Sequence, residues 1–229
     1  MKSAYRSAVT SLLPLFPLKT VLLPGAPLPL YIFEPRYRQM VGDLLALDAA
    51  DDRRFGVIAI RQGREVGAHG VRSLHEIGCA ALMTEADSNE DGTYTLRTVG
   101  TTRFVLQSVD DELPYLRAAV EWLPEPAGDV GGLAATVAVR YRRYLETLGA
   151  LTGIQTPEPP NPDDPRLLSY LVAATVVADL PDRQGFLAAP DAASRLAAES
   201  AWLSREHFLM TSLASVPAGD KLGSTPTIN

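Results

Sequence analysis

The stretch that decides the fold is LPLFPL at residues 13–18, followed by LPLYIFEPRY at residues 28–37. Apolar residues and prolines come in a fixed order here, as in short strands that end at tight connections. The second stretch then leads into a helix. Pro35 is favoured at a first helical position, and Glu34 lies where a carboxylate complements the positive end of a helix. This order is typical of a recognition domain rather than of a catalytic motif.

Short apolar runs bounded by Gly, Pro and Asp continue to about residue 123 and predict a sheet-rich domain with one early helix near residues 34–49. Residues 87–92 predict a hairpin loop, and Gly100-Thr101-Thr102 predicts a second tight connection. Such a succession indicates a small closed or nearly closed barrel, which leaves few free edges. Further strands are expected at residues 55–60, 77–84, 93–99, 103–109 and 115–122.

The second half of the chain is predicted to be helical. Asp163 or Asp164 should cap the second of its helices, and Asp191 should cap the last. On that last helix, Leu196, Leu203 and Met210 form a seven-residue stripe that predicts a buried face. Helices are expected at residues 133–151, 165–178 and 191–215, with a short helical turn at 182–188.

Together these patterns predict an α+β chain in two parts. Residues 13–123 form the barrel subdomain and residues 133–217 the helical bundle subdomain, separated by a Pro- and Gly-rich linker at 124–132. Residues 1–12 are expected to be a flexible N-terminus and residues 218–229 a disordered tail.

Composition limits the classes of function. The chain has 229 residues, is 46% hydrophobic, and carries a formal net charge of −6, which disfavours nucleic acid as the main partner. No apolar run is long enough for a membrane span, and no export signal is visible. Cys79 is the only cysteine, so no disulfide can form within the chain. We therefore predict a cytoplasmic protein without a membrane partner.

The sequence contains no recognisable catalytic or cofactor-binding motif. A phosphate loop needs a Gly-Lys pair, which is absent, and Lys19 is the only candidate for a serine–lysine dyad. His69, His75 and His207 lack metal-ligand spacing, and the predicted strand around Cys79 favours a buried thiol. We therefore expect no metal site, no cofactor and no enzymatic activity.

One basic-aromatic cluster has two interpretations. Arg140, Arg142 and Arg143 are interleaved with Tyr141 and Tyr144 on a predicted helix. The cluster could meet an acidic partner or RNA. The favoured interpretation is a solvated helix face with its tyrosines turned inward.

Several motifs resemble one family in order and spacing. From about residue 13 to residue 213 the chain is similar to the N-terminal, substrate-binding domain of Lon proteases, the S16 peptidases. The motifs that carry the resemblance are LFPL at 15–18, LPG at 23–25, LPL at 28–30, FEPRY at 33–37, LHEIG at 74–78, Arg103-Phe104, and APDAA at 189–193.

The resemblance implies a PUA-like pseudo-β-barrel followed by an α-helical bundle. In Lon this module engages unfolded or degron-bearing proteins, whereas the ATPase and protease lie downstream of it. We therefore predict a non-catalytic module that captures unfolded or apolar peptide segments, as an adaptor or chaperone-like factor. The alternative is an RNA-binding PUA-like protein, and a third option is a small-ligand pocket between barrel and bundle.

The predicted peptide-binding residues are those of the FEPRY turn and its neighbours. In the structural interpretation, Glu34 caps the helix, Tyr37 packs on the barrel and Arg36 makes an internal ion pair. In the functional interpretation, the exposed members line a groove where a peptide adds to a sheet edge, and Arg103 contacts its backbone or a carboxylate. The candidate residues are Tyr31, Phe33, Glu34, Arg36, Tyr37 and Arg103.

Overall fold

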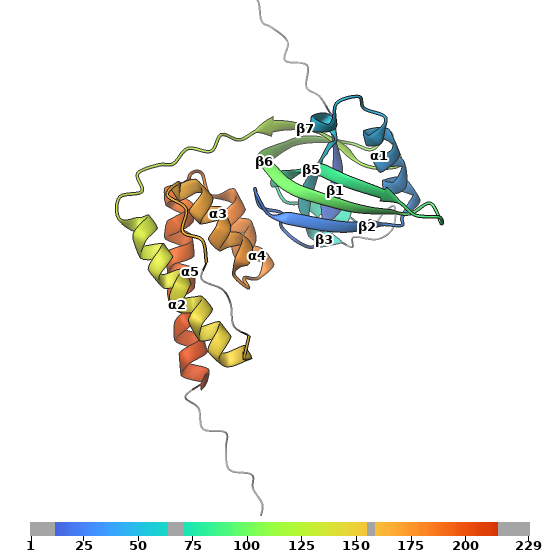
Figure 1. Cartoon of the computed structure of the whole chain (residues 1–229). Coiled ribbons are helices and arrows are strands. Elements are labelled where there is room, and N and C mark those ends of the chain that lie inside the picture. Colours follow the sequence, from blue (N-terminus) through green and yellow to red (C-terminus); the bar gives the residue numbers. More distant parts are fainter. Residues whose placement is uncertain (1–11, 64–70, 155–158, 215–229) are drawn as a thin grey trace, which may run out of the picture.

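Figure 1 shows the computed structural model, in which the strands lie on one side and the long C-terminal helices on the other. It describes residues 12–63, 71–154 and 159–214. The flexible N-terminus predicted over residues 1–12 lies outside the described residues except for Leu12. The predicted tail at 218–229 and His69 lie outside them entirely.

The first half of the chain forms a mixed sheet. Its strands follow the order β1-β7-β6-β5-β3-β4, and β2 pairs with β6. The loop predicted at 87–92 is a tight turn, in which Asn89 N donates to Thr93 O at 2.9 Å. The strands are β1 (Leu13–Leu18), β2 (Pro27–Ile32), β3 (Arg54–Gly63), β4 (Val71–Leu74), β5 (Ile77–Ser88), β6 (Tyr94–Asp110) and β7 (Arg117–Trp122).

Strand β1 joins the two ends of this sheet without closing it fully. Leu13 and Pro14 pair antiparallel with β7, whereas Leu15 to Leu18 pair in parallel with β3. Strand β1 is therefore paired with β7 along its first part and with β3 along the rest. Of the two predicted alternatives, the fully closed barrel is wrong, because among the described residues β7 has no β1 partner beyond the pair of Ala118 with Leu13.

The tight connection predicted at Gly100 is wrong, because β6 runs without interruption through that position. A Cβ atom at Gly100 would lie 2.2 Å from the carbonyl oxygen of Leu23. Gly100 N also donates to Ala26 O, and Gly25 N donates to Gly100 O, at 2.9 and 2.8 Å. The glycine therefore permits a close approach of two backbones within a strand rather than a turn.

Helix α1 (Pro35–Leu45) lies on the side of the sheet that faces away from the C-terminal helices (Figure 1). Pro35 is its first residue, as predicted. The helix ends four residues before the predicted end near Ala49, and a 3-10 turn (Ala50–Asp52) follows. The side chains of Met40, Val41 and Leu44 are buried against the sheet.

The second half is helical, as predicted. Asp164 accepts a hydrogen bond from Arg166 N at 2.9 Å, and Asp191 accepts one from Ser194 N at 2.7 Å, so both act as caps. Leu196, Leu203 and Met210 are buried. The turn predicted at 182–188 is a complete helix. The helices are α2 (Leu133–Thr152), α3 (Pro165–Thr175), α4 (Leu180–Ala188) and α5 (Ala192–Ala214).

One apolar core runs from the sheet into the helices, and includes Leu23 and Cys79 as well as Val172 and Leu196. Burial raises the pKa of the Cys79 thiol to about 12, so it stays protonated at neutral pH. Within the described ranges, no helix is both long and apolar enough to cross a membrane. The same residues contain no group of three or more potential metal ligands.

The core contains one carboxylate without a described hydrogen-bond partner. Glu199 on α5 is fully buried, and neither of its oxygens accepts a hydrogen bond from the part of the chain that the structure describes. Burial raises the pKa of Glu199 well above 4.5, although the nearby charge of Arg195 acts in the opposite direction. The folded protein therefore keeps a proton that the unfolded chain releases above about pH 4.5.

Glu199→Gln should therefore change the pH dependence of stability. Below pH 4.5 the side chain is neutral in both folded and unfolded states, so the variant should match the parent chain. As the pH rises toward the folded-state pKa, the free energy of unfolding of the parent falls by about 1.4 kcal/mol per pH unit, and that of the variant does not. Urea unfolding of both proteins between pH 4 and 8 measures the difference. Glu146→Gln, at an exposed position on α2, is the control, and parallel curves for all three proteins would contradict the prediction.

Candidate functional site

Of the predicted site residues, Tyr31 and Phe33 are the two most exposed. Their side chains are 58% and 54% accessible. The rings stack on each other with centroids 6.4 Å apart, and Thr93 Oγ1 donates to the Tyr31 hydroxyl oxygen at 3.1 Å. They form a small aromatic patch beside the β5–β6 turn.

The rest of the FEPRY turn is occupied by internal contacts. Glu34 stands at the N-cap position of α1 but its side chain makes no capping hydrogen bond, which corrects the structural interpretation. It forms an ion pair with Arg36 at 3.1 Å instead. The Arg36 guanidinium lies 4.4 Å from the ring centre of Tyr37, which is buried against Phe16. These contacts position the helix on the sheet.

The prediction that Arg103 lies with the FEPRY turn in a peptide-binding groove is wrong. Its side chain is only 1% exposed, and it donates to the carbonyl oxygens of Leu187 and Ala189 at 2.7 and 2.6 Å. It also forms an ion pair with Glu125. Arg103 therefore ties the sheet to the end of α4 and is not available to a peptide, nor is it a surface arginine.

The edge of β2 is a poor template for an added strand. Proline has no N–H to donate, so Pro27 and Pro29 take the positions of β2 that face away from β6. Thr98 Oγ1 donates to Leu28 O at 2.7 Å, which agrees with Leu28 facing β6. The outer edge of β2 therefore offers the N–H of Tyr31 but none at either proline.

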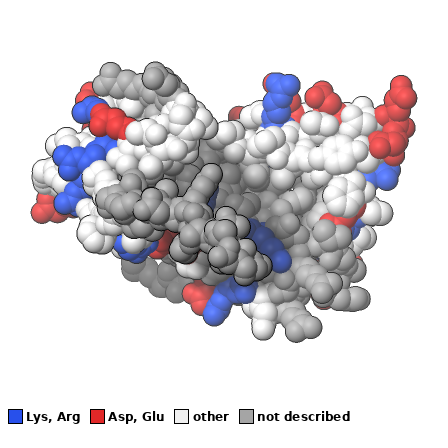
Figure 2. Space-filling model, turned by 90° about the horizontal axis from the view of Figure 1, so that it is seen from below, with Lys and Arg blue, Asp and Glu red and all other residues white. Residues whose placement is uncertain are grey.

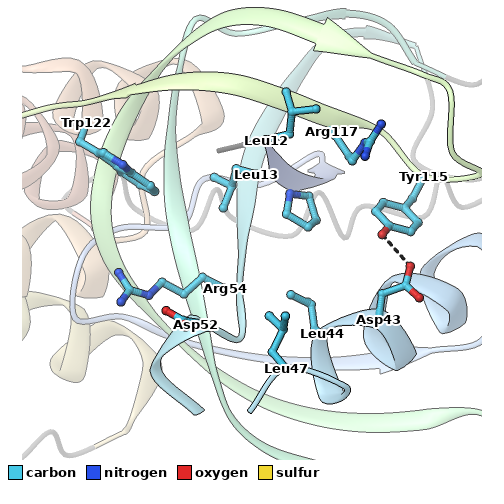
Figure 3. Close-up of a pocket in the computed structure, with 11 residues that line it drawn as sticks. Leu12, Leu13, Asp43, Leu44, Leu47, Asp52, Arg54, Tyr115, Arg117 and Trp122 are labelled. Carbon is cyan, nitrogen blue, oxygen red and sulfur yellow. Dashed lines mark hydrogen bonds between the residues drawn. The ribbon is translucent and has the colours of Figure 1, made fainter. Parts of the chain in front are cut away.

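A more suitable edge lies on β7, beside a pocket of about 530 Å³ (Figure 3). Trp122 and Leu12 lie on one side of the pocket, and Leu44 and Leu47 on the other. The Trp122 side chain is 44% exposed and packs edge-on against Phe104. Leu12 and Leu47 are also exposed. The apolar lining is thus open to the surface.

The pocket also carries charged groups of both signs. The Tyr115 hydroxyl donates to Asp43 at 2.7 Å, and burial together with this hydrogen bond raises the pKa of Tyr115 to about 12. Arg117 forms an ion pair with Asp110 at 2.6 Å. Arg54 donates from Nε to Asp51 O at 2.5 Å, and its side chain lines the pocket. The pocket is therefore apolar with a balanced polar rim.

The pocket lies beside the start of β1, where Leu13 and Pro14 pair with β7. Leu15 N donates to Leu116 O, and Leu123 N donates to Arg103 O, at 2.7 and 2.9 Å. Alternation along the strand then directs the backbone groups of Val120 and Trp122 away from β6. The register of β1 with β7 stops at Leu13, so among the described residues these groups have no strand partner. The edge can accept an extended segment.

The sequence reasoning missed this site. Trp122 was placed on a strand, but the pocket residues Leu12, Leu47 and Arg54 were not singled out. The one available signal was a tryptophan at the last position of a strand, directly before a Pro-rich segment.

The basic-aromatic cluster on α2 agrees with the solvated-face interpretation. Tyr141 and Tyr144 are buried, whereas Arg140, Arg142 and Arg143 are exposed. Arg140 donates to Ser200 O and Oγ at 2.9 and 2.7 Å. On the face shown in Figure 2, basic and acidic side chains are mixed on both the helical and the strand sides. The described residues on that face form no continuous basic groove.

Comparison with protein families decides where this fold belongs. The model of the ATP-dependent protease La (LON) substrate-binding domain matches residues 12–205. The chain belongs to this family. The match includes every strand and most of α5, so the sheet and the helices together correspond to one Lon substrate-binding domain.

Relatives of this Lon substrate-binding domain include complete Lon proteases. Lon protease 2 of Myxococcus xanthus is 25% identical over 193 residues, which are 82% of this chain and 23% of the relative. Lon protease 1 of Thermus thermophilus is 28% identical over 201 residues, 85% of this chain and 24% of the relative. The chain thus spans about a quarter of the length of the curated relatives it matches.

Solved structures show the same fold. A Lon N-terminal domain protein from Xanthomonas campestris is 27% identical, with a TM-score of 0.57, and the match covers 84% of this chain and 98% of that one. The N-terminal domain of Mycobacterium avium complex Lon protease has a TM-score of 0.63 at 16% identity, over 85% and 98% of the two chains. The second similarity concerns the fold alone.

Proposed function

We propose that this Lon substrate-binding domain captures extended apolar segments of unfolded or degron-bearing proteins at the β7 edge, without catalysis of its own. The observation that carries the proposal is the backbone of Val120 and Trp122, which has no strand partner among the described residues and lies beside an exposed apolar pocket. An added strand would gain backbone hydrogen bonds from the edge, and its alternate side chains would enter the pocket. Membership of a substrate-binding family supports a protein as the ligand.

An adaptor or chaperone-like role, acting on apolar segments without a fixed sequence, is part of the same proposal. Backbone pairing with an edge does not depend on sequence, and a pocket lined by Trp122, Leu12 and Leu47 accepts apolar side chains of several shapes. Tyr31 and Phe33 offer a second apolar contact for a client. A cytoplasmic location is supported by the free, buried thiol of Cys79.

We also propose the finer description of the fold, a PUA-like pseudo-β-barrel with a separate C-terminal helical bundle. The pairing of β1 with both β7 and β3 supports the first part. The succession of α2 to α5 supports the second. The division at residues 124–132 agrees with the absence of helix or strand between Trp122 and Leu133 in that described segment.

Leu47→Glu should weaken client binding by about tenfold, because it places a charge in the apolar pocket, at an exposed position two residues after the end of α1. Leu209→Glu, at a similarly exposed position on α5, is the matched control and should bind normally. Fluorescence anisotropy of a labelled, unfolded client protein measures both. Equal affinities for the two variants would place the site elsewhere.

Backbone pairing has its own test. In an added strand, every second backbone N–H faces the neighbouring strand. A synthetic apolar peptide that binds the parent chain should therefore lose binding when N-methyl groups block the N–H groups that face β7. It should keep binding when they block the alternate N–H groups, which face away. A chain without residues 1–11 should bind the same peptide at least as tightly. Loss of binding in that shortened chain, or equal binding of both methylated peptides, would contradict strand addition at β7.

A further inference from the structure

A second cavity of about 530 Å³ lies between the sheet and the helices. The connection between β1 and β2 forms one wall, and helix α3 forms the other. This size falls within the range of small-molecule sites, which commonly lie between structural units. The walls are mostly apolar and consist of Pro24, Ala26 and Pro27 opposite Leu167, Leu171 and Ala174.

Two carboxylates line this interdomain cleft, those of Asp164 and Glu125, and Glu125 is 27% exposed. Its Oε1 accepts hydrogen bonds from Arg103 and from the Tyr170 hydroxyl, the latter at 2.5 Å. Among the described residues its Oε2 accepts only from Arg195 Nη2, at a long 3.5 Å. A carboxylate has about four acceptor sites, so Oε2 retains capacity for another donor.

The two arginines behind Glu125 decide which donor fits. Their side chains are 1% and 0% exposed, so a ligand meets the carboxylate and not the guanidinium groups. An anion would be repelled by the carboxylate. One of the two arginines already balances the charge of Glu125, and the other leaves the group with one positive charge in excess. A cation would be repelled by that excess charge. A neutral donor satisfies Oε2 without adding charge.

The rim of the cleft does not change this balance. Arg166 holds Asp164 with two nitrogens, through contacts of 2.8 to 3.2 Å, so its charge is already paired. Burial raises the pKa of Tyr170, which therefore stays protonated and keeps its hydrogen bond to Glu125. The remaining lining side chains are apolar except that of Thr175, whose hydroxyl donates to Leu171 O at 2.7 Å.

We propose that the interdomain cleft is a binding site for a neutral, mostly apolar small molecule that carries one N–H or O–H donor for Glu125. Indole is a suitable probe because it combines an aromatic body with a single N–H. Benzothiophene has a similar shape without the donor. Indole-3-acetate adds an anion, and tryptamine adds a cation.

Binding is measured by two-dimensional NMR titration of the full chain. Indole should shift resonances of α3 and of residues 24–27, and benzothiophene should bind about tenfold more weakly, because it offers no donor to the remaining acceptor sites of Glu125 Oε2. The two charged analogues should bind more weakly than indole. Equal binding of benzothiophene and indole, or shifts confined to other regions, would overturn the proposal.

A cleft-filling variant provides the second test. Ala174→Phe places a ring in the cleft, one helical turn from Tyr170, and should abolish the indole shifts. Val139→Phe introduces the same residue at an exposed site on α2 and should leave them unchanged. Both variants must retain the amide spectrum of a folded protein. Indole binding that survives Ala174→Phe would show that the cleft is not the site.

Discussion

Arg103→Met is expected to lower the free energy of unfolding by about 3–5 kcal/mol, the range for removing one partner of a buried ion pair. The guanidinium donates to Leu187 O, Ala189 O and Pro124 O, and pairs with Glu125. Methionine fills much of the same space but satisfies none of these acceptors. The loss would be a large fraction of the stability of an ordinary domain.

The matched control lies on the same strand. Arg97 pairs with Glu85 at 2.7 Å, but these side chains are 68% and 53% exposed. Surface pairs of this kind contribute less than about 1 kcal/mol, so Arg97→Met should change stability little. Urea unfolding curves compare the two variants directly. If both shift the unfolding midpoint by the same amount, the Arg103 network does not hold the sheet to the helices.

Glu125 stands at the centre of this network, in the segment predicted to be a linker. The segment is held at several points, since Ala192 N donates to Pro126 O and Ala193 N to Ala127 O, at 3.1 and 2.9 Å. Proline and glycine content therefore identified a segment without helix or strand, but not its attachment to α5. Those hydrogen bonds join residues more than sixty positions apart, which composition does not encode.

Local signals in the sequence were sufficient for the starts of the three helices α1, α3 and α5. Pro35 marks the start of α1, and Asp164 and Asp191 cap the helices predicted to follow them. The stripe that includes Leu196 and Leu203 is buried as its spacing predicts. Each of these signals acts within a few residues of the chain, so it can be read without the tertiary structure.

The candidate site depends on contacts that are distant in sequence. Among the described residues the backbone of Trp122 has no strand partner, because β1 begins at Leu13, which pairs with Ala118, and Trp122 lies beyond that pair. Arg103 was predicted to reach a peptide, yet it contacts Leu187, which is 84 positions away. Neither arrangement follows from alternation or propensity, which describe one strand at a time.

Gly100→Ala is the second change with a large expected effect, and lowers the free energy of unfolding by about 3 kcal/mol, at the upper end of the range for overpacking. The added Cβ would lie 2.2 Å from Leu23 O and 2.9 Å from Leu23 C, both of which are backbone atoms. A backbone cannot rotate away as a side chain can. The contact must therefore push the β1–β2 connection from β6 and break its hydrogen bonds at Gly25 and Ala26.

Gly42→Ala should act in the opposite direction, which makes it the informative control for this prediction. Gly42 lies inside α1, and a Cβ there would meet nothing within 4 Å. Alanine in a helix interior is favoured over glycine by up to about 1 kcal/mol, so the variant should be more stable than the parent. Thermal and urea unfolding of both variants then separate the two roles of glycine. Stabilisation by both would mean that β6 does not touch the β1–β2 connection at Gly100, whereas opposite signs would place the two backbones in contact there.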